Sequence, residues 1–476
     1  MDERIAAIRV SAGGTQTFRG PAIWLALALT HNAALGQCNP QGGDGPDVIV
    51  GDIAGTFNYT SSGALEAVAF GFSLSNIGTQ WLNCSTGTNQ HALTTQSLYK
   101  LSTAGGYTTI EQLGQSWAFH EFFELSQLLS CPTCTPTNGT HLGVGCASAN
   151  SASVVGSQNR LAPRWQVNAA TGAFAFPPAN PAFSGSVARR LQVRISDLEP
   201  TSPTTRYLAE LLTIAPDDAA AGNATNNASS RGIAVTGSGI AWNFTLAASS
   251  TTAPARPAIL AWKESDPGVT ESIVDVAGDG RFIVCSRATD MGGGVFHYEY
   301  AAFNLTSDRS CDSFSVPVST GVSAIGFHDV DYHDGDGPGD VDYSNADWTS
   351  LLAAGSLTFA TESYSANPSA NAIRWGTMYN FRFDCTRPPS HGQVTLGLFK
   401  PGIPASVVAG AVVPSAGCPA DFNADGSVDF FDYDNFVTCF EGLACPPGSG
   451  GADFNHDSAV DFFDYDAFVL AFETPC

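Results

Sequence analysis

Residues 421–432 read Asp-Phe-Asn-Ala-Asp-Gly-Ser-Val-Asp-Phe-Phe-Asp, and residues 453–464 read Asp-Phe-Asn-His-Asp-Ser-Ala-Val-Asp-Phe-Phe-Asp. Both copies place side-chain oxygens at the first, third, fifth, ninth and twelfth positions. This is the spacing of the ligands in an EF-hand type of calcium loop. The repeat therefore predicts two calcium sites in a small, duplicated domain.

Each copy offers a full set of oxygen ligands, which suits calcium because this ion takes about six to eight oxygens. The first set is Asp421, Asn423, Asp425, the Ser427 carbonyl, Asp429 and Asp432. The second set is Asp453, Asn455, Asp457, the Ala459 carbonyl, Asp461 and Asp464. Carboxylates this close repel one another without a cation, so we expect calcium to order the loops.

The two loops depart from the common EF-hand pattern in two ways. The closing ligand is Asp in both copies, where Glu is usual, so the following helix must sit closer to the ion. The sixth position is Gly426 in the first copy and Ser458 in the second. This position needs a backbone angle that Gly adopts freely and Ser does not, so we expect the second site to be strained or weaker.

A short helix is predicted after each loop, with apolar residues on one face. These residues are Phe436, Val437 and Phe440 in the first copy and Phe468, Val469 and Phe472 in the second. The two faces can pack around a pseudo-twofold axis. Disulfide bonds would stabilise so small a domain. Cys418 and Cys476 lie at its two ends and could join them, and Cys439 and Cys445 could close the turn after the first helix.

The duplicated loop and helix in residues 418–476 resemble a type I dockerin, in a variant found on exported bacterial proteins of planctomycete type. The resemblance implies calcium-dependent binding to a cohesin-like partner, and thus attachment to a larger assembly or to the cell surface. Dockerins often carry a Ser-Thr-like pair at loop positions ten and eleven. Here those positions are Phe430, Phe431, Phe462 and Phe463, which either contact the partner or fill the small core.

Composition and the first residues point to export. The net charge of −24 argues against nucleic acid or an anionic membrane as a partner. Residues 1–37 contain arginines, then an apolar run at 21–30, then small residues, as in a secretory signal. That run is too short to span a bilayer. We therefore expect a protein that is secreted or held at the cell surface.

All 12 cysteines follow the predicted signal, which predicts disulfides in an oxidising compartment. Cys131 and Cys134, with His141 and Cys146, could alternatively suggest zinc or redox chemistry. A zinc site would be better indicated by two Cys-x-x-Cys pairs. Disulfide bonding is the favoured interpretation of these cysteines.

The body is predicted to be mainly β, an antiparallel β-sandwich-like fold in two domains, residues 38–246 and 258–400. Short strands at 258–263, 272–276, 281–286, 296–304, 313–318, 379–384 and 393–399 are separated by turn residues. Residues 115–125 are the best helix candidate. Segments 247–257 and 401–417 are predicted linkers because they are rich in small residues and Pro.

The body offers weaker functional signals. Residues 328–342 are dense in Asp and His and form either a metal-binding loop or a solvated surface loop. His120 is better explained by packing than by ligation. No nucleophile elbow is present. Candidate acids for a glycoside hydrolase are Glu121, Glu124, Glu264, Glu271 and Glu299, and none stands out.

The body is similar only to uncharacterised exported proteins, and that similarity implies no activity. The alternatives to a structural cargo are a polysaccharide-degrading enzyme, since dockerins often carry such partners, and a carbohydrate-binding sandwich.

Overall fold

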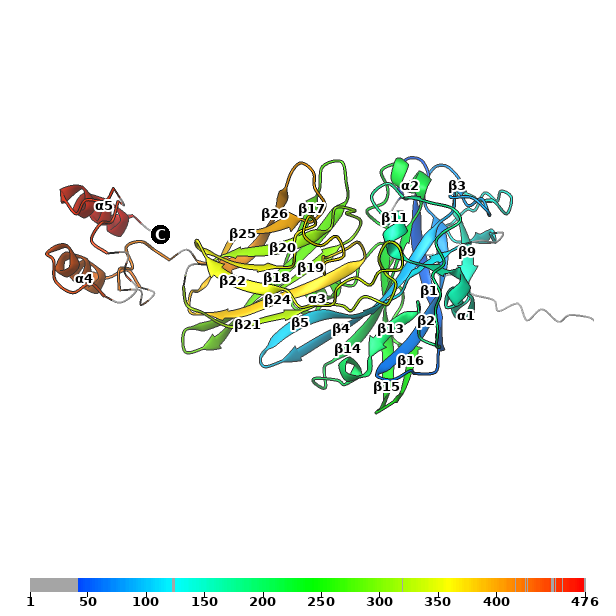
Figure 1. The fold of residues 1–476 in the computed structure, drawn as a ribbon, viewed down its shortest axis with the longest axis horizontal. Coiled ribbons are helices and arrows are strands. Elements are labelled where there is room, and N and C mark those ends of the chain that lie inside the picture. The colour runs from blue at the N-terminus through cyan, green and yellow to red at the C-terminus, as the bar shows by residue number, and fades with distance from the viewer. Residues whose placement is uncertain are drawn as a thin grey trace, which may run out of the picture.

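The computed structural model describes residues 42–121, 125–318, 320–415, 417–423, 425, 427–446, 449, 451–455 and 457–474. It consists of a β-rich body and a small helical module at the C-terminal end (Figure 1). The predicted signal segment, residues 1–37, lies outside the described residues. We call residues 42–246 the first lobe of the body and residues 258–414 the second lobe.

The first lobe is built on one large antiparallel sheet. Its strands follow the order β16-β15-β14-β4-β5-β13-β2-β9-β7, with β1 paired to β2 and β6 joining β10 to β4. The sheet folds over, so that β1 packs against β14, β15 and β16. One core cluster within this lobe includes Val50, Phe70, Phe72, Leu98 and Phe244.

The strands of the first lobe are β1 (Val48–Asn58), β2 (Leu65–Asn76), β3 (Leu82–Asn83), β4 (Leu93–Ala104), β5 (Tyr107–Gln115), β6 (Ala118–His120), β7 (Leu128–Leu129), β8 (His141–Leu142), β9 (Cys146–Asn150), β10 (Leu161–Ala162), β11 (Val167–Asn168), β12 (Ala173–Phe174), β13 (Leu191–Arg194), β14 (Arg206–Ile214), β15 (Ala228–Ser238) and β16 (Ala241–Leu246). Its short helices are α1 (Ala152–Val155), η1 (Gln158–Arg160), η2 (Arg164–Gln166), η3 (Ile195–Leu198) and α2 (Pro216–Ala220).

The second lobe is a sandwich of two five-stranded antiparallel sheets, ordered β17-β18-β19-β24-β21 and β22-β23-β20-β25-β26. Inward-facing aromatic residues of both sheets fill its core. Phe314 of one sheet and Phe381 of the other stack with ring centroids 4.4 Å apart. The fold is therefore mainly β and antiparallel, as the alternating sequence pattern predicts.

The elements of the second lobe are α3 (Leu260–Ser265), β17 (Thr270–Asp275), β18 (Arg281–Gly292), β19 (Val295–Asn304), β20 (Cys311–Pro317), β21 (Val322–His328), β22 (Thr349–Ala353), β23 (Ser356–Ala360), β24 (Thr377–Cys385), β25 (Pro389–Leu398) and β26 (Ser406–Pro414). The module contains α4 (Phe430–Phe440) and α5 (Phe462–Glu473).

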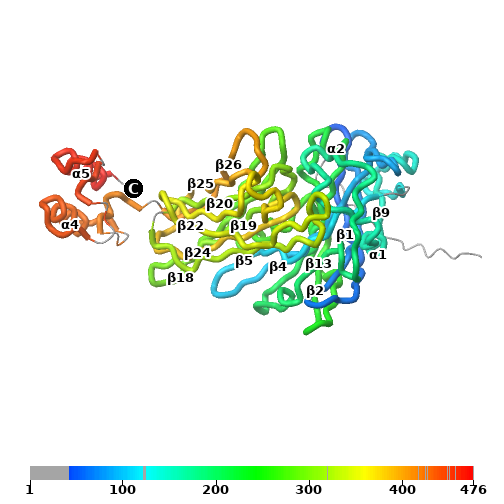
Figure 2. Tube along the Cα trace, in the orientation of Figure 1, coloured from blue at the N-terminus to red at the C-terminus, as the bar shows by residue number. Residues whose placement is uncertain are grey.

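The two lobes share a hydrophobic core, so they are not independent domains joined by a linker. Strand β5 of the first lobe contacts β19 and β24 of the second, and the β4–β5 hairpin runs along the second lobe in Figures 1 and 2. One buried cluster joins Tyr99 and Ile110 of this hairpin to Ile283, Phe303 and Met378.

Three local predictions are wrong. Residues 115–125 were expected to be helical, but Gln115 ends β5 and residues 118–120 form β6, because residues 115–121 are all buried. Residues 122–124 lie outside the described residues. Residues 258–263 were expected to be a strand, but α3 begins at Leu260 and directs Trp262 into the shared core. Residues 401–417 were expected to be a linker, but most of them form β26.

Strand β26 was missed because its inward-facing residues are small. Ala409, Ala411 and Val413 are buried in the sandwich core and alternate with more exposed neighbours. The strand pairs with β25 along its whole length and also contacts β17. Alanine in such a pattern is easily mistaken for linker composition.

Gln112 fastens the two lobes together, and its replacement by Leu is expected to destabilise the body. Its fully buried amide donates to Ser97 Oγ (2.9 Å) and to the Gly376 carbonyl (3.2 Å), and accepts from the Met378 N–H (2.6 Å). Gln112→Leu leaves the Met378 N–H without this acceptor, at an expected cost of about 2–4 kcal/mol. Urea unfolding of the full chain measures this loss.

The matched control for this prediction is Gln393→Leu on the exposed face of β25. It should change the free energy of unfolding by no more than about 0.5 kcal/mol. Equal effects of the two variants would contradict the role of Gln112 as a fastening between the lobes.

Candidate functional site

The module is built from two equivalent halves that meet through phenylalanines. Phe436 of α4 and Phe468 of α5 stack with ring centroids 4.0 Å apart and an angle of 5° between the rings. Phe422 lies edge-on to Phe436 at 5.2 Å, and its equivalent Phe454 lies edge-on to Phe468 at 5.3 Å. These paired contacts confirm that the two helical faces pack together in a pseudo-twofold arrangement.

The same symmetry extends to the loops, whose hydrogen bonds match one for one. The carboxylate of Asp432 accepts from the N–H groups of Asn423 and Asp429, each at 2.9 Å. In the second loop Asp464 accepts from Asn455 (3.0 Å) and Asp461 (2.8 Å). The twelfth position of each loop therefore ties the third and ninth positions to the start of the helix.

Other loop carboxylates also accept bonds from the backbone. Asp421 accepts from the Asp425 N–H at 3.0 Å, and Asp453 accepts from the Asp457 N–H at 3.1 Å. The N–H groups of Asn455 and Asp461 lower the pKa of Asp464, because they stabilise its ionised form. These backbone bonds hold the carboxylate oxygens around each loop.

Each loop leads directly into a helix through a capping box. Asp429 caps α4 by accepting from the Phe431 N–H at 2.8 Å, and Asp461 caps α5 by accepting from the Phe463 N–H at 2.8 Å. The ninth loop residue is therefore both a predicted ligand and the N-cap, which couples loop geometry to helix formation.

The donor set fits calcium better than a transition metal, because it contains carboxylate, amide and carbonyl oxygens and no sulfur or imidazole among the predicted ligands. Within the described ranges, no three His, Cys, Asp or Glu side chains are grouped closely enough to hold a metal. The loop carboxylates accept backbone N–H groups in this conformation. Carboxylate oxygens have further lone pairs with which to bind a cation.

Ser458 adopts the left-handed backbone angle expected at the sixth loop position, with φ of 75°. Its N–H donates to Asp453 at 3.0 Å, so the unusual angle has a role in arranging the loop. A non-glycine residue in this region is strained. The positive φ expected at this position is thus present in the second copy. That the second site is weaker than the first stays a prediction, because Gly426 lies outside the described residues.

Ser458→Gly is expected to stabilise the second loop by about 1 kcal/mol, because Gly removes the steric strain at positive φ. It should tighten calcium binding at one of two sites severalfold in a calorimetric titration. Ala459→Gly is the matched control, because Ala459 is the next residue in the loop and does not have a positive φ. A gain for Ala459→Gly as large as that for Ser458→Gly would refute the strain at Ser458.

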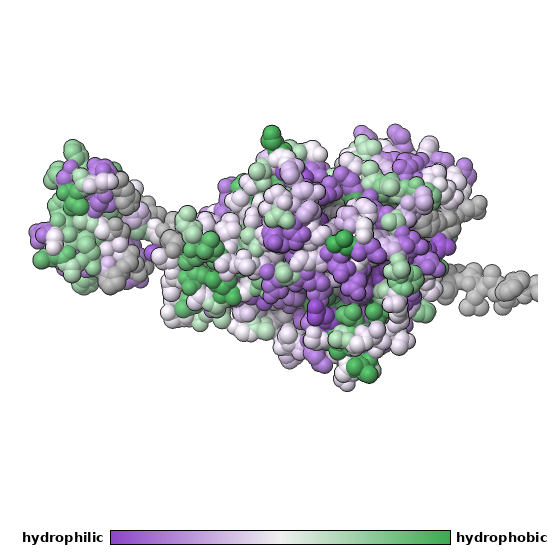
Figure 3. All heavy atoms as spheres, in the orientation of Figure 1, coloured by the Kyte–Doolittle hydropathy of each residue, from purple (hydrophilic) through white to green (hydrophobic). Residues whose placement is uncertain are grey.

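The four phenylalanines at loop positions ten and eleven all point to solvent. Their exposed fractions are 69% for Phe430, 64% for Phe431, 67% for Phe462 and 68% for Phe463. The module core is instead supplied by Phe422, Phe436 and Phe468, with Phe454 packed against them. Of the two interpretations of these pairs, core filling is therefore wrong, and Figure 3 shows apolar residues on the surface of the module.

The cysteines divide into bonded and buried free residues. Cys439 and Cys445 form the predicted disulfide after α4. Cys134 and Cys146 form another, and Cys131 is also disulfide-bonded, so the zinc or redox interpretation of this cluster is wrong. Cys418 is disulfide-bonded, whereas Cys476 lies outside the described residues.

Four cysteines contradict the expectation that all would form disulfides. Cys84, Cys285, Cys311 and Cys385 are free and buried in the hydrophobic clusters of the body. Burial raises the pKa of each of these thiols, because the thiolate is disfavoured in apolar surroundings. They act as small apolar core residues.

The acidic segment 328–342 is buried in part: residues 332, 333 and 335–337 are buried, whereas Asp334 and residues 338–342 are exposed. Asp336 is buried and accepts hydrogen bonds from Trp117 Nε1 of the first lobe and from the His333 N–H. Asp331 forms an ion pair with Arg194 of the first lobe. Asp331 and Asp336 thus connect this segment to the first lobe, while Asp334, Asp340 and Asp342 remain exposed.

The described candidate catalytic acids of the body form ion pairs or hydrogen bonds with neighbouring side chains. Glu299 pairs with Arg382 at 3.0 Å, Glu264 with Arg256 at 2.5 Å, and Glu271 with Lys263 at 3.3 Å. Glu121 is buried beside Asn150, and burial raises its pKa to about 7. Glu124 lies outside the described residues.

His120 lies on strand β6 and not on a helix, but the prediction that it packs in the interior is confirmed. It hydrogen-bonds to His91 at 2.9 Å. Burial lowers its pKa to about 3.

The comparisons with known proteins identify no family for this chain. No family model matches the chain, and no curated protein matches it. A solved serine-rich repeat adhesion glycoprotein of Streptococcus agalactiae aligns with 74% of this chain and 89% of its own, at 7% identity and a TM-score of 0.19. In the described ranges, no helix is long and apolar enough to cross a membrane.

Proposed function

We propose that this chain is a secreted protein whose C-terminal module binds two calcium ions and docks onto a cohesin-like partner at the cell surface or in an extracellular assembly. The observation that carries the proposal is the symmetric exposure of Phe430, Phe431, Phe462 and Phe463 directly beside two oxygen-rich loops. The body is the cargo that the module holds in place.

Exposed aromatic pairs are costly in a soluble domain unless a partner covers them. Large apolar side chains that are exposed together on a surface mark interaction sites. Phenylalanine also supplies much of the binding energy when it fills a pocket at the centre of an interface. Since the two pairs are related by the pseudo-twofold axis, either pair can present the same surface to one partner.

Calcium would control the docking because the ligands and the contact residues are adjacent. Phe430 and Phe431 begin α4 immediately after Asp429, and Asp432 follows them. An ion held by Asp429 and Asp432 would fix the first turn of the helix and hence the direction of both rings. The same relation holds for Phe462 and Phe463 between Asp461 and Asp464.

The first test is a calorimetric calcium titration of the full chain after chelation. We expect two ions per chain and a rise in the thermal stability of the module, because binding to the folded state stabilises it. A chain that takes up no calcium would refute the calcium part of the proposal.

The second test uses immobilised full chain to capture partners from the extracellular fraction of its source, with and without chelator. We expect a specific protein to be retained only with calcium, and to be lost with Phe430→Ser, Phe431→Thr, Phe462→Ser and Phe463→Thr combined. Leu443→Ser with Leu470→Ser is the matched control, since these residues are exposed by 63% and 69% but lie away from the pairs. Equal capture by both variants would refute the docking surface.

A further inference from the structure

The junction of the two lobes encloses a cavity of about 300 Å³ that the docking function does not use. It opens between η2 of the first lobe and the loops around β20, β22 and β24 of the second. This volume matches the lower end of the range for small-molecule sites. Its walls combine aromatic rings with a few charged groups, which is the usual composition of a ligand pocket.

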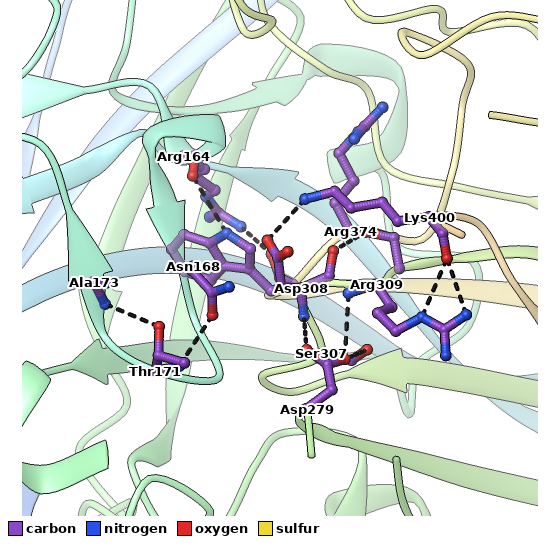
Figure 4. A network of polar contacts seen from close by, with 12 residues as sticks. Arg164, Asn168, Thr171, Ala173, Asp279, Ser307, Asp308, Arg309, Arg374 and Lys400 are labelled. Atoms are coloured by element: carbon purple, nitrogen blue, oxygen red, sulfur yellow. Dashed lines mark hydrogen bonds and ion pairs between the residues drawn. The ribbon is translucent and has the colours of Figure 1, made fainter. Parts of the chain in front are cut away.

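Arg164 and Arg374 supply the positive charge of this cavity. Arg164 is fixed by bonds from Nε to the Ser116 carbonyl (2.7 Å) and from Nη1 to the Gly376 carbonyl (3.2 Å). Burial lowers its pKa only to about 10, so it remains charged at neutral pH. Figure 4 shows Arg164 approaching from the first lobe, opposite Asp308, Arg374 and Lys400 of the second.

Arg374 is held in place by its neighbours, but not all of its hydrogen-bond donors have an acceptor. Its guanidinium carbon lies 3.6 Å from the centroid of the Tyr343 ring, and Nη2 donates to the Pro368 and Ala370 carbonyls, each at 3.1 Å. Among the described residues, Nε and Nη1 have no hydrogen-bond acceptor and no carboxylate forms an ion pair with this side chain. A charged guanidinium held in place in this way suits a ligand carboxylate, which can accept a charge-assisted hydrogen bond from it.

The carboxylates of the cavity do not cancel this charge. Asp308 is already paired with Lys400 at 2.8 Å. Burial raises the pKa of Asp336 to about 7, so much of it is neutral near that pH. The cavity is therefore cationic in a chain whose net charge is −24. An anion is the ligand that such a local excess favours.

The aromatic walls indicate a ring-shaped ligand. Trp165, which is 36% exposed, lines the cavity together with Tyr343 and Tyr364. Ser310 and Ser369 also belong to the lining. Rings can stack on one face of a sugar or of an aromatic acid, while hydroxyls favour the sugar because they can pair with its hydroxyl groups.

We infer that this cavity binds a small carboxylate-bearing ring, the chemistry of a sugar acid such as a uronate, with Arg374 as the carboxylate ligand and Trp165 as the stacking wall. The inference concerns the body alone and stands independently of the docking module. Binding of a sugar acid would make the body a recognition domain for acidic glycans.

The test is calorimetric titration of the full chain with galacturonate, with galactose as the neutral match and with benzoate as the aromatic acid. We expect galacturonate to bind at least about tenfold more tightly than galactose, the factor that one charge-assisted contact supplies. Tighter binding of benzoate than of galacturonate would overturn the assignment to a sugar acid. No binding of either acid, or equal binding of galactose and galacturonate, would overturn the inference.

Two variants locate the ligand. Arg374→Gln should weaken galacturonate binding at least about tenfold and leave galactose unaffected. Because Arg374 also bonds to backbone carbonyls, Trp165→Ala provides a second variant at a half-exposed residue, with an expected loss of about tenfold for both sugars. Arg256→Gln, at an exposed arginine outside the cavity, is the control for charge. Unchanged galacturonate binding in both Arg374→Gln and Trp165→Ala would overturn the assignment.

Discussion

Replacing Asp432 and Asp464 together by Ala is expected to abolish calcium binding by the full chain and to unfold the start of both module helices. Each carboxylate closes its predicted ligand set and also accepts two backbone N–H bonds from the loop. Loss of the ligand should weaken calcium affinity more than about 100-fold, since one buried charged ligand contributes several kcal/mol. Loss of the capping box adds about 1 kcal/mol for each helix.

The matched control is Asp434→Ala with Asp466→Ala. These aspartates are exposed, occupy equivalent positions on α4 and α5, and change the net charge by the same amount. They should retain two calcium ions per chain in calorimetry and show unchanged helical circular dichroism. If both double variants bound calcium with the wild-type affinity, the twelfth loop residues could not be ligands.

The module was the most predictable part of the chain because its determinants are local. The ligand spacing, the N-caps and the helical phenylalanines all lie within a few residues of one another, so the pattern carries the structure directly. The strain at Ser458 follows in the same way from its alignment with Gly426. The exposure of Phe430 and Phe431 could not be predicted from the sequence. It depends on which phenylalanine rings of one half pack against the other half of the module.

The body was predictable in class but not in arrangement. Alternation predicts its strands, yet residues 115–125 look helical because the apolar residues at 117–119 are buried by strands distant in sequence. Burial of Asp336 against Trp117 likewise depends on how the lobes meet. The cavity has no sequence signal at all, since Arg164 and Arg374 come together only through the shared core.

Phe468→Ala is expected to unfold the module while leaving the body folded. Phe468 is fully buried and contacts Phe436, Phe422, Phe454 and Phe472, so its ring joins both halves of the module. Truncating such a ring costs about 3–5 kcal/mol. This is comparable to the whole stability that so small a core supplies, about 3–5 kcal/mol. Hydrogen exchange of the full chain should show loss of protection in α4 and α5 only.

The control for this variant is Phe462→Ala, because Phe462 is on the same helix and is 67% exposed. It should preserve protection in both helices, even though the docking proposal assigns it a role in partner binding. The contrast separates the two kinds of phenylalanine: those at positions 436 and 468 hold the halves together, and those of the exposed pairs are free to contact a partner. If Phe468→Ala exposed α5 alone and α4 kept its protection, the two halves would not share a core, and the two contact surfaces would lose their fixed relation.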